Sequence, residues 1–142
     1  MLLLAGCGED GGATAGSAAA APAKPAAGGK ERAAVGCPSQ LGAFVDSLHT
    51  LRRQLAIGLS YEQYAAQMKE LRRSYNQLPI DRLTIACLAA IGTPAEAAFN
   101  KYIDAANAWG ECLADASCTA VAIEPVLQRK WRVASGSLFE AH

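Results

Sequence analysis

The sequence predicts an all-α domain, an up-down antiparallel bundle of four to five helices braced by disulfides. From residue 38 onward, apolar residues recur at alternating spacings of three and four, which is the pattern of helices that bury one face. Short connections separate these segments, so neighbouring helices are expected to run in opposite directions. No stretch of four or more residues alternates between apolar and polar side chains as a half-buried strand does.

The first helix is expected over residues 38–57, because Pro38 suits an opening turn and Gly58 suits the position after a helix end. Its apolar face consists of Leu41, Phe44, Leu48, Leu51 and Leu55. Ser60 and Gln63 have the spacing of a capping box that opens the second helix. Pro79 ends that helix, because the residue before a proline avoids the α conformation. The second apolar face consists of Tyr61, Tyr64, Met68, Leu71, Tyr75 and Leu78.

A short third helix is expected over residues 81–91, with Ile80, Leu83 and Cys87 facing inward and Gly92 as its stop. The run Thr93-Pro94-Ala95-Glu96 places a capping threonine, a proline and a glutamate at the start of a fourth helix. That helix is expected to bury Phe99, Tyr102, Ala106, Trp109 and Leu113. Residues 118–123 are expected to form a separate turn, and the last helix to start near Pro125. Its apolar face consists of Leu127, Trp131, Ala134 and Leu138.

The composition divides the chain into residues 1–7, 8–35 and 36–142. The middle part is dominated by Ala, Gly, Pro and Ser and cannot bury enough apolar surface to offset the entropy of ordering it. We therefore expect a disordered linker over residues 8–35, with a root-mean-square span of about 30 Å. The helical bundle domain is expected over residues 36–142.

The N-terminal run Leu4-Ala5-Gly6-Cys7 resembles the lipobox of bacterial lipoproteins. The resemblance implies that the Cys7 thiol carries a lipid, that the preceding peptide is removed, and that the protein is held on the outer, extracytoplasmic face of the cell membrane. Only residues 1–3 precede the motif, fewer than the basic and apolar regions of a signal peptide require, so residues 1–7 are expected to be a truncated signal segment. The overall plan resembles uncharacterised small lipoproteins of actinobacteria, a resemblance that implies no activity.

Four further cysteines, Cys37, Cys87, Cys112 and Cys118, are an even number in a chain expected outside the cytoplasm, which favours two disulfides. Sequence alone leaves three pairings open. Helix geometry favours Cys37–Cys87, at one end of an up-down bundle, and Cys112–Cys118, across the turn between the last two helices. The alternatives are buried free thiols and a metal site, although zinc ligands usually lie closer together in sequence.

No candidate catalytic group stands out. The histidines are His49, expected to be exposed, and His142 at the end of the chain, and the carboxylates are scattered over positions expected to face solvent. We therefore expect no enzyme activity, no cofactor and no metal. Thirteen basic and 13 acidic residues give a net charge of zero, which argues against nucleic-acid binding. Apolar runs are too short for the roughly 20 residues of a membrane-spanning helix.

The aromatic residues mostly coincide with the predicted apolar faces. Where some are exposed side by side, they are the first candidates for a binding patch, because Tyr and Trp are enriched at interaction hot spots. The candidate patch consists of Tyr61, Tyr64, Trp109 and Trp131. We expect a binding or protein-interaction module of the cell envelope, with an envelope protein as one candidate partner. The alternatives are an enzyme with an unrecognised site and a structural or sensory subunit of a membrane complex.

Basic residues are interspersed along the predicted helices and are expected to form a solvated face. An alternative is contact with anionic lipid head groups near the tether. The residues concerned are Arg52, Arg53, Arg72, Arg73, Arg129, Lys130 and Arg132.

Overall fold

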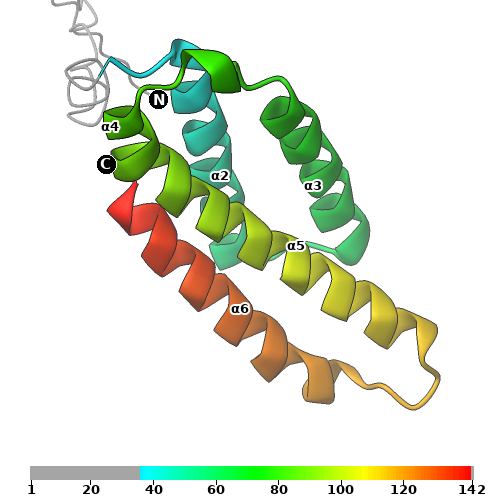
Figure 1. Ribbon diagram of the computed structural model, residues 1–142. Helices are drawn as coiled ribbons and strands as arrows, with labels where there is room; N and C mark the ends of the chain where they lie inside the picture. Colours follow the sequence, from blue (N-terminus) through cyan, green and yellow to red (C-terminus); the bar gives the residue numbers. More distant parts are fainter. Residues whose placement is uncertain (1–35, 142) are drawn as a thin grey trace, which may run out of the picture.

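Four long helices run alternately down and up in the computed structural model, which describes residues 36–141 (Figure 1). These are α2 (Ser39–Ile57), α3 (Tyr61–Asn76), α5 (Thr93–Ala114) and α6 (Ala120–Glu140). Between α3 and α5 lie the short elements η1 (Ile80–Arg82), α4 (Ile85–Cys87) and η2 (Leu88–Gly92). All elements of the described residues are helical, which confirms the predicted antiparallel bundle. The signal segment with Cys7, the linker and His142 lie outside the described residues.

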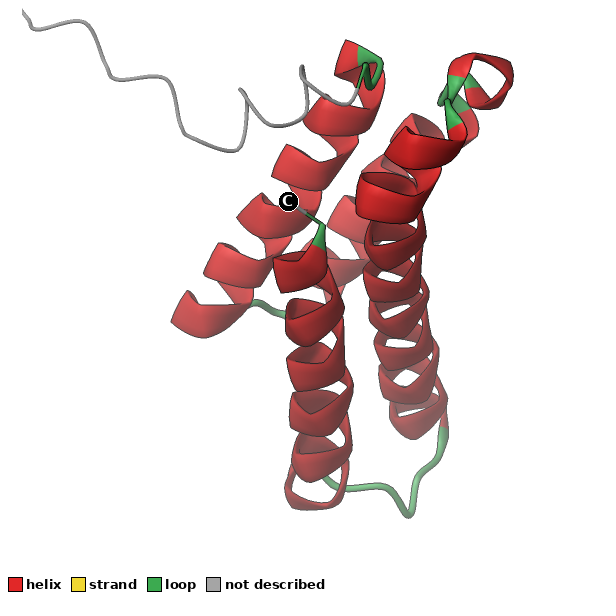
Figure 2. Ribbon diagram, turned by 60° about the vertical axis from the view of Figure 1, so that its left-hand side comes forward, coloured by secondary structure: helices red, strands yellow, loops and turns green. Residues whose placement is uncertain are grey.

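The core is formed by the apolar faces that the sequence predicts. Each long helix contributes buried side chains, including Leu48, Tyr64, Tyr102 and Leu138. The alanines at positions 95, 98, 105 and 134 are also fully buried, and such small side chains let helices approach closely. The most extensive contact joins α5 and α6, which lie side by side along their length in both views (Figures 1 and 2).

The start of α2 is joined to α4 by a disulfide between Cys37 and Cys87, whose Cα atoms are 5.4 Å apart. Cys87 is completely buried and belongs to the apolar core. The end of α6 lies at this same end of the bundle (Figure 1). We call it the proximal end, because the described chain begins here at Gly36.

The predicted break between a third and a fourth helix is wrong. Thr84 caps the helical segment by accepting a hydrogen bond from the Cys87 N–H at 3.1 Å, and the backbone then stays helical through Gly92 and Thr93. The turn over Leu88–Gly92 is a π turn, in which the Thr93 N–H bonds to the Leu88 carbonyl. This wider turn directly precedes Pro94, which has no N–H to donate and would crowd the carbonyl four residues earlier.

The predicted start of the last helix near Pro125 is also wrong. Thr119 caps α6 by accepting a hydrogen bond from the Ala122 N–H at 3.2 Å, so most of the predicted separate turn over residues 118–123 belongs to the helix. Pro125 lies in the second turn of α6. A proline this close to the N-terminus removes one backbone hydrogen bond without ending the helix.

Three side chains differ from the predicted burial. Ile80 and Leu113, expected to face inward, are 56% and 60% exposed. Ile80 lies in the short η1 element and not on a long helix, while Leu113 lies in the last turn of α5, where α2 and α3 no longer cover it. His49, expected to be exposed, is half-buried on α2.

Candidate functional site

A cleft of about 520 Å³ lies at the end of the bundle opposite Gly36, which we call the distal end. It forms because the hairpin of α5 and α6 extends past the turn between α2 and α3 (Figures 1 and 2). Residues 85–114 form one continuous helical segment, which is longer than the 19-residue α2 and the 16-residue α3. The large apolar residues in its lining are Leu55, Leu59, Trp109, Leu113, Ile123, Leu127 and Trp131.

The α2–α3 turn that borders the cleft is built as the sequence predicts. Gly58 has a φ of 116°, a conformation that favours glycine, and its N–H bonds to the Gln54 carbonyl at 2.9 Å. Ser60 Oγ accepts from the Gln63 N–H, and Gln63 Oε1 accepts from the Ser60 N–H. This confirms the predicted capping box and fixes Leu59 at the edge of the cleft.

The four aromatic residues of the candidate patch form one continuous cluster behind the cleft. Ring centroids are 5.6 Å apart for Tyr61 and Trp109, 5.9 Å for Tyr64 and Trp109, and 6.0 Å for Trp109 and Trp131. Such tilted and edge-to-face pairs are the favoured aromatic geometries. Trp109 and Trp131 line the cleft, whereas Tyr64 is completely buried beneath them. The two tryptophans are therefore the part of the cluster that faces the cleft, and Tyr61 is half-buried outside its lining.

Tyr64 holds this cluster in place through its hydroxyl. The hydroxyl donates to the Tyr102 carbonyl on α5 at 2.8 Å and accepts from Trp131 Nε1 on α6 at 3.3 Å. Burial raises the pKa of Tyr64, more than the hydrogen bond from Trp131 lowers it. The neutral phenol thus connects α3, α5 and α6 directly below the two tryptophans.

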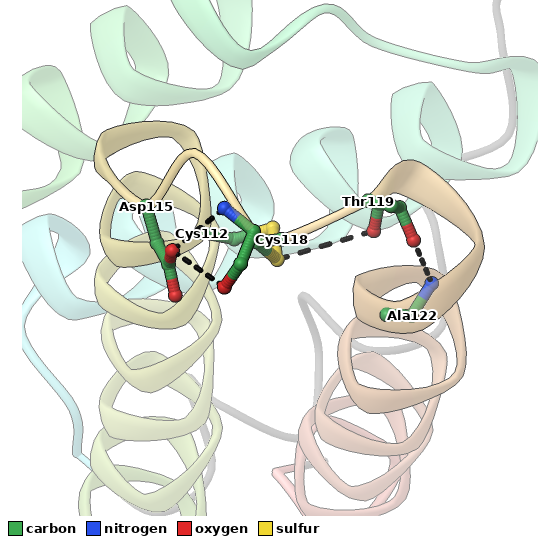
Figure 3. The surroundings of a disulfide bond; sticks show 6 residues. Cys112, Asp115, Cys118, Thr119 and Ala122 are labelled. Atoms are coloured by element: carbon green, nitrogen blue, oxygen red, sulfur yellow. Dashed lines mark hydrogen bonds between the residues drawn. A yellow bond between two sulfur atoms is a disulfide. The ribbon is translucent and has the colours of Figure 1, made fainter.

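A short disulfide closes the loop at the far side of the cleft (Figure 3). Cys112 and Cys118 are paired, with Cα atoms 5.2 Å apart, and both line the cleft. Within the loop, Asp115 Oδ1 accepts from the N–H and the hydroxyl of Ser117 at 2.8 and 2.7 Å. The Ser117 side chain, followed by its backbone, holds the pKa of Asp115 below its usual range. Both predicted disulfide pairings are thus present.

A second hollow, of about 330 Å³, lies beside the cleft between α2 and α6. Leu55, Gln128 and Trp131 line both spaces. The hollow also includes the side chains of Arg52, Arg53 and Arg132. The sequence analysis placed these arginines on a solvated face and did not bring them together.

A third hollow, of about 530 Å³, lies between α2 and α3, and polar residue types such as Asp46, Thr50, Gln54 and Glu70 are in its lining. The hydroxyls of Ser47 and Thr50 in this lining donate to the backbone carbonyls of Ala43 and Asp46, each at 2.9 Å, and not to a carboxylate base. Within residues 36–141, no group of three or more His, Cys, Asp or Glu side chains is placed to hold a metal ion.

Of the site residues predicted from the sequence, the structure brings together the four aromatics and the two members of each disulfide. Sequence reasoning missed Leu55, Leu59 and Leu113 as cleft residues and the adjoining arginines. The unequal lengths of the helices could have indicated the cleft, because apolar residues beyond the ends of the shorter helices have no partner to cover them.

No helix in the described part of the chain is long and apolar enough to cross a membrane. No protein-family model, no curated protein and no solved structure matches the chain, so the cleft and its surroundings are the basis for inferring function.

Proposed function

We propose that this protein is an extracytoplasmic lipoprotein, anchored to the cell membrane through Cys7, whose helical domain is a binding module of the cell envelope. The observation that carries the proposal is the tryptophan-lined cleft at the distal end of the domain. Wide apolar spaces with a few polar groups are the usual form of binding sites in proteins. The exposed apolar side chain of Leu113 lines the cleft.

The position of the cleft agrees with a tethered binding module. In the proposed arrangement the linker over residues 8–35 joins Cys7 to the proximal end, where the described chain begins. The cleft lies at the other end of the bundle and is therefore free to meet a ligand in the envelope. A span of about 30 Å lets the domain move while it stays close to the membrane.

Asp115, one of two carboxylates that line the cleft, favours binding over catalysis. Asp115 has a lowered pKa and hydrogen bonds within its own loop, so it is ionised and already occupied. A general acid needs the opposite, a carboxyl whose pKa is raised toward neutrality. The remaining large side chains that line the cleft are mostly apolar, which suits recognition of an apolar surface or chain.

Incorporation of labelled palmitate into the full chain, placed after a complete bacterial signal peptide, tests the anchor. The chain should incorporate label and fractionate with membranes, because lipidation with two or more acyl chains gives stable anchoring. The matched control is Cys7→Ala, which should be unlabelled and released. Labelling that persists in Cys7→Ala, or a full chain that stays unlabelled, would contradict the anchor.

A photoreactive amino acid at position 113 tests whether the cleft binds in the cell. Leu113 is 60% exposed, so the substitution leaves the core intact. We expect a discrete adduct at this position. The matched control is the exposed position Lys69 on α3, away from the cleft, where no such adduct should form. Identical patterns at the two positions would contradict a binding role for the cleft.

A further inference from the structure

We propose that the cleft and the adjoining hollow together bind an anionic amphiphile with a single hydrocarbon chain, a long-chain carboxylate. The hydrocarbon chain lies in the tryptophan-lined cleft and the carboxylate lies among the arginines of the hollow. This inference rests on the proposed binding function and specifies its ligand.

The two spaces are adjacent and have different chemistry. Trp131 belongs to both linings, together with Leu55 and Gln128, so the two spaces adjoin at these side chains. Their volumes of about 520 and 330 Å³ are each within the range of small-molecule sites. A molecule that fills both must be apolar over most of its length and polar at one end.

The sign of charge in the hollow selects an anion. Arg52, Arg53 and Arg132 line it, and its lining includes no acidic residue. The three arginines take part in neither of two ion pairs of the described region, Arg73 with Glu70 and Lys101 with Asp104. Arg53 Nη2 donates to Thr50 Oγ1 at 2.9 Å. A guanidinium group matches the two oxygens of a carboxylate and can bind them with two parallel hydrogen bonds.

The acidic residues near the cleft lie away from the hollow and orient the ligand. Asp115 in the disulfide loop and Glu124 on the first turns of α6 line the cleft but not the hollow. An anionic head group is repelled from this part of the cleft and attracted toward the arginines. The site is therefore polarised along its length.

Tyr102 is buried next to two residues that line the hollow, Arg52 and Ser135. Its side chain is completely buried and its hydroxyl makes no hydrogen bond of good geometry. Burial raises the pKa of Tyr102, while Ser135 and Arg52, both lining the hollow, lower it to a smaller extent.

Intrinsic fluorescence measures occupancy directly, because the chain has two tryptophans and both line the cleft. The full chain with Cys7→Ser is titrated with dodecanoate at pH 8, below the micelle concentration. Dodecyltrimethylammonium and dodecyl maltoside are the cationic and neutral probes. We expect saturable 1:1 binding of dodecanoate, at least tenfold weaker binding of the cation, and weaker binding of decanoate by roughly tenfold, since each buried methylene contributes about fourfold.

Variants locate the two ends of the ligand. Arg52→Gln and Arg132→Gln should each weaken dodecanoate binding about tenfold and leave dodecyl maltoside unchanged. The matched control is Arg72→Gln, an exposed arginine on α3 that does not line the hollow. Leu113→Glu should weaken all three probes, and its circular dichroism spectrum should remain that of the parent chain, because Leu113 is outside the core.

Equal affinity for the three head groups, or arginine variants that bind dodecanoate as well as the parent, would overturn the carboxylate assignment. A response that is unchanged by Leu113→Glu would overturn the cleft as the site. If no amphiphile binds but position 113 still forms its adduct in cells, the ligand class is wrong and the binding function remains. If both fail, the binding function fails as well.

Discussion

The two ends of the domain are each closed by a disulfide, but the bonds join different kinds of segment. At the proximal end, Cys37 and Cys87 are 50 positions apart, and Cys87 is buried in the core. At the distal end, Cys112 and Cys118 are 6 positions apart and line a cleft together with the exposed side chain of Leu113. The first bond joins segments on either side of α2 and α3, whereas the second fixes the shape of one loop. The comparison indicates that the disulfide stabilises more of the chain at the proximal end, while the proposed binding function belongs to the distal end.

Removing each disulfide in turn is the strongest test of this difference. In the loop-entropy treatment, Cys37→Ser with Cys87→Ser lowers the free energy of unfolding by about 4 kcal/mol, because a long loop of the unfolded chain is released. Cys112→Ser with Cys118→Ser lowers it by about 2 kcal/mol. Urea unfolding of both variants, in a chain that also carries Cys7→Ser, measures the two values.

The same pair of variants separates stability from binding. Loss of the distal disulfide should weaken dodecanoate binding, since one wall of the cleft becomes mobile, while loss of the proximal disulfide should leave binding unchanged at temperatures where the domain is folded. Equal loss of stability in both variants, or loss of binding in the proximal one alone, would remove the distinction between the two ends.

Alkaline pH provides a second comparison, through two tyrosines. Tyr64, below the cleft, has its pKa raised by burial, and Tyr75, between α3 and α5, has its pKa raised by burial and by its hydrogen bond to Glu96 at 2.8 Å. A raised pKa means that the folded state holds the phenol proton more tightly than the unfolded chain. This stabilisation is fully present below about pH 10 and is lost as the pH rises above it.

Tyr64→Phe should therefore reduce the loss of stability above pH 10 by up to about 1.4 kcal/mol per pH unit. At neutral pH the same variant should lose about 2 kcal/mol, because the Tyr102 carbonyl and Trp131 Nε1 lose their shared partner. Tyr75→Phe should have a smaller effect on how steeply the free energy of unfolding falls with pH above pH 10, since Tyr75 is only half-buried. Unfolding curves between pH 8 and 11.5 measure the slopes, and parallel slopes for Tyr64→Phe and the parent would contradict the role of the buried phenol.

The elements that sequence predicts well are those that depend on local chemistry. The capping box of Ser60 and Gln63 lies where it was predicted, and α2 ends at the predicted residue, Ile57. The run from Thr93 to Glu96 has equally good local chemistry, but α5 continues there from the helical turn before it, without a capping bond. There, Thr84 caps the segment nine residues earlier and a π turn accommodates Pro94, so the local motif is overridden by a longer helix.

The site was predictable only in part, for a related reason. The spacing of the aromatics places Tyr61, Tyr64, Trp109 and Trp131 on inward faces of their helices, and they do meet. Whether they meet under a covering helix or beside an open cleft depends on where each helix ends in space. The grouping of Arg52 with Arg132 likewise depends on how α2 packs against α6, which no local pattern contains.

The turn between α2 and α3 borders the cleft and supplies a smaller test. Ser60→Ala should lower the free energy of unfolding by about 1 kcal/mol, because the Gln63 N–H loses its acceptor. Ser39→Ala at the proximal start of α2 is the matched control, since the Ser39 side chain makes no capping bond there. Thermal unfolding measures both variants. Equal destabilisation by Ser39→Ala and Ser60→Ala would show that the Ser60 capping bond does not contribute to the free energy of unfolding.

The smallest expected effect concerns Gly110, where the aromatic cluster meets α5. A Cβ atom at this position would lie 2.7 Å from the Tyr61 hydroxyl oxygen, too close for contact, and 3.5 Å from the ring carbon that bears it. Glycine inside a helix costs about 0.5–1 kcal/mol relative to alanine, so its presence here is explained by the approach of Tyr61.

Gly110→Ala should be neutral or slightly destabilising in the parent chain, because the clash offsets the gain in helix propensity. In a Tyr61→Phe background, where the oxygen is gone, the same substitution should stabilise by about 0.5 kcal/mol. A double-mutant cycle by urea unfolding measures the change of sign; if Gly110→Ala has the same effect in both backgrounds, Tyr61 does not press against α5 and the cluster behind the cleft is looser than its ring distances indicate.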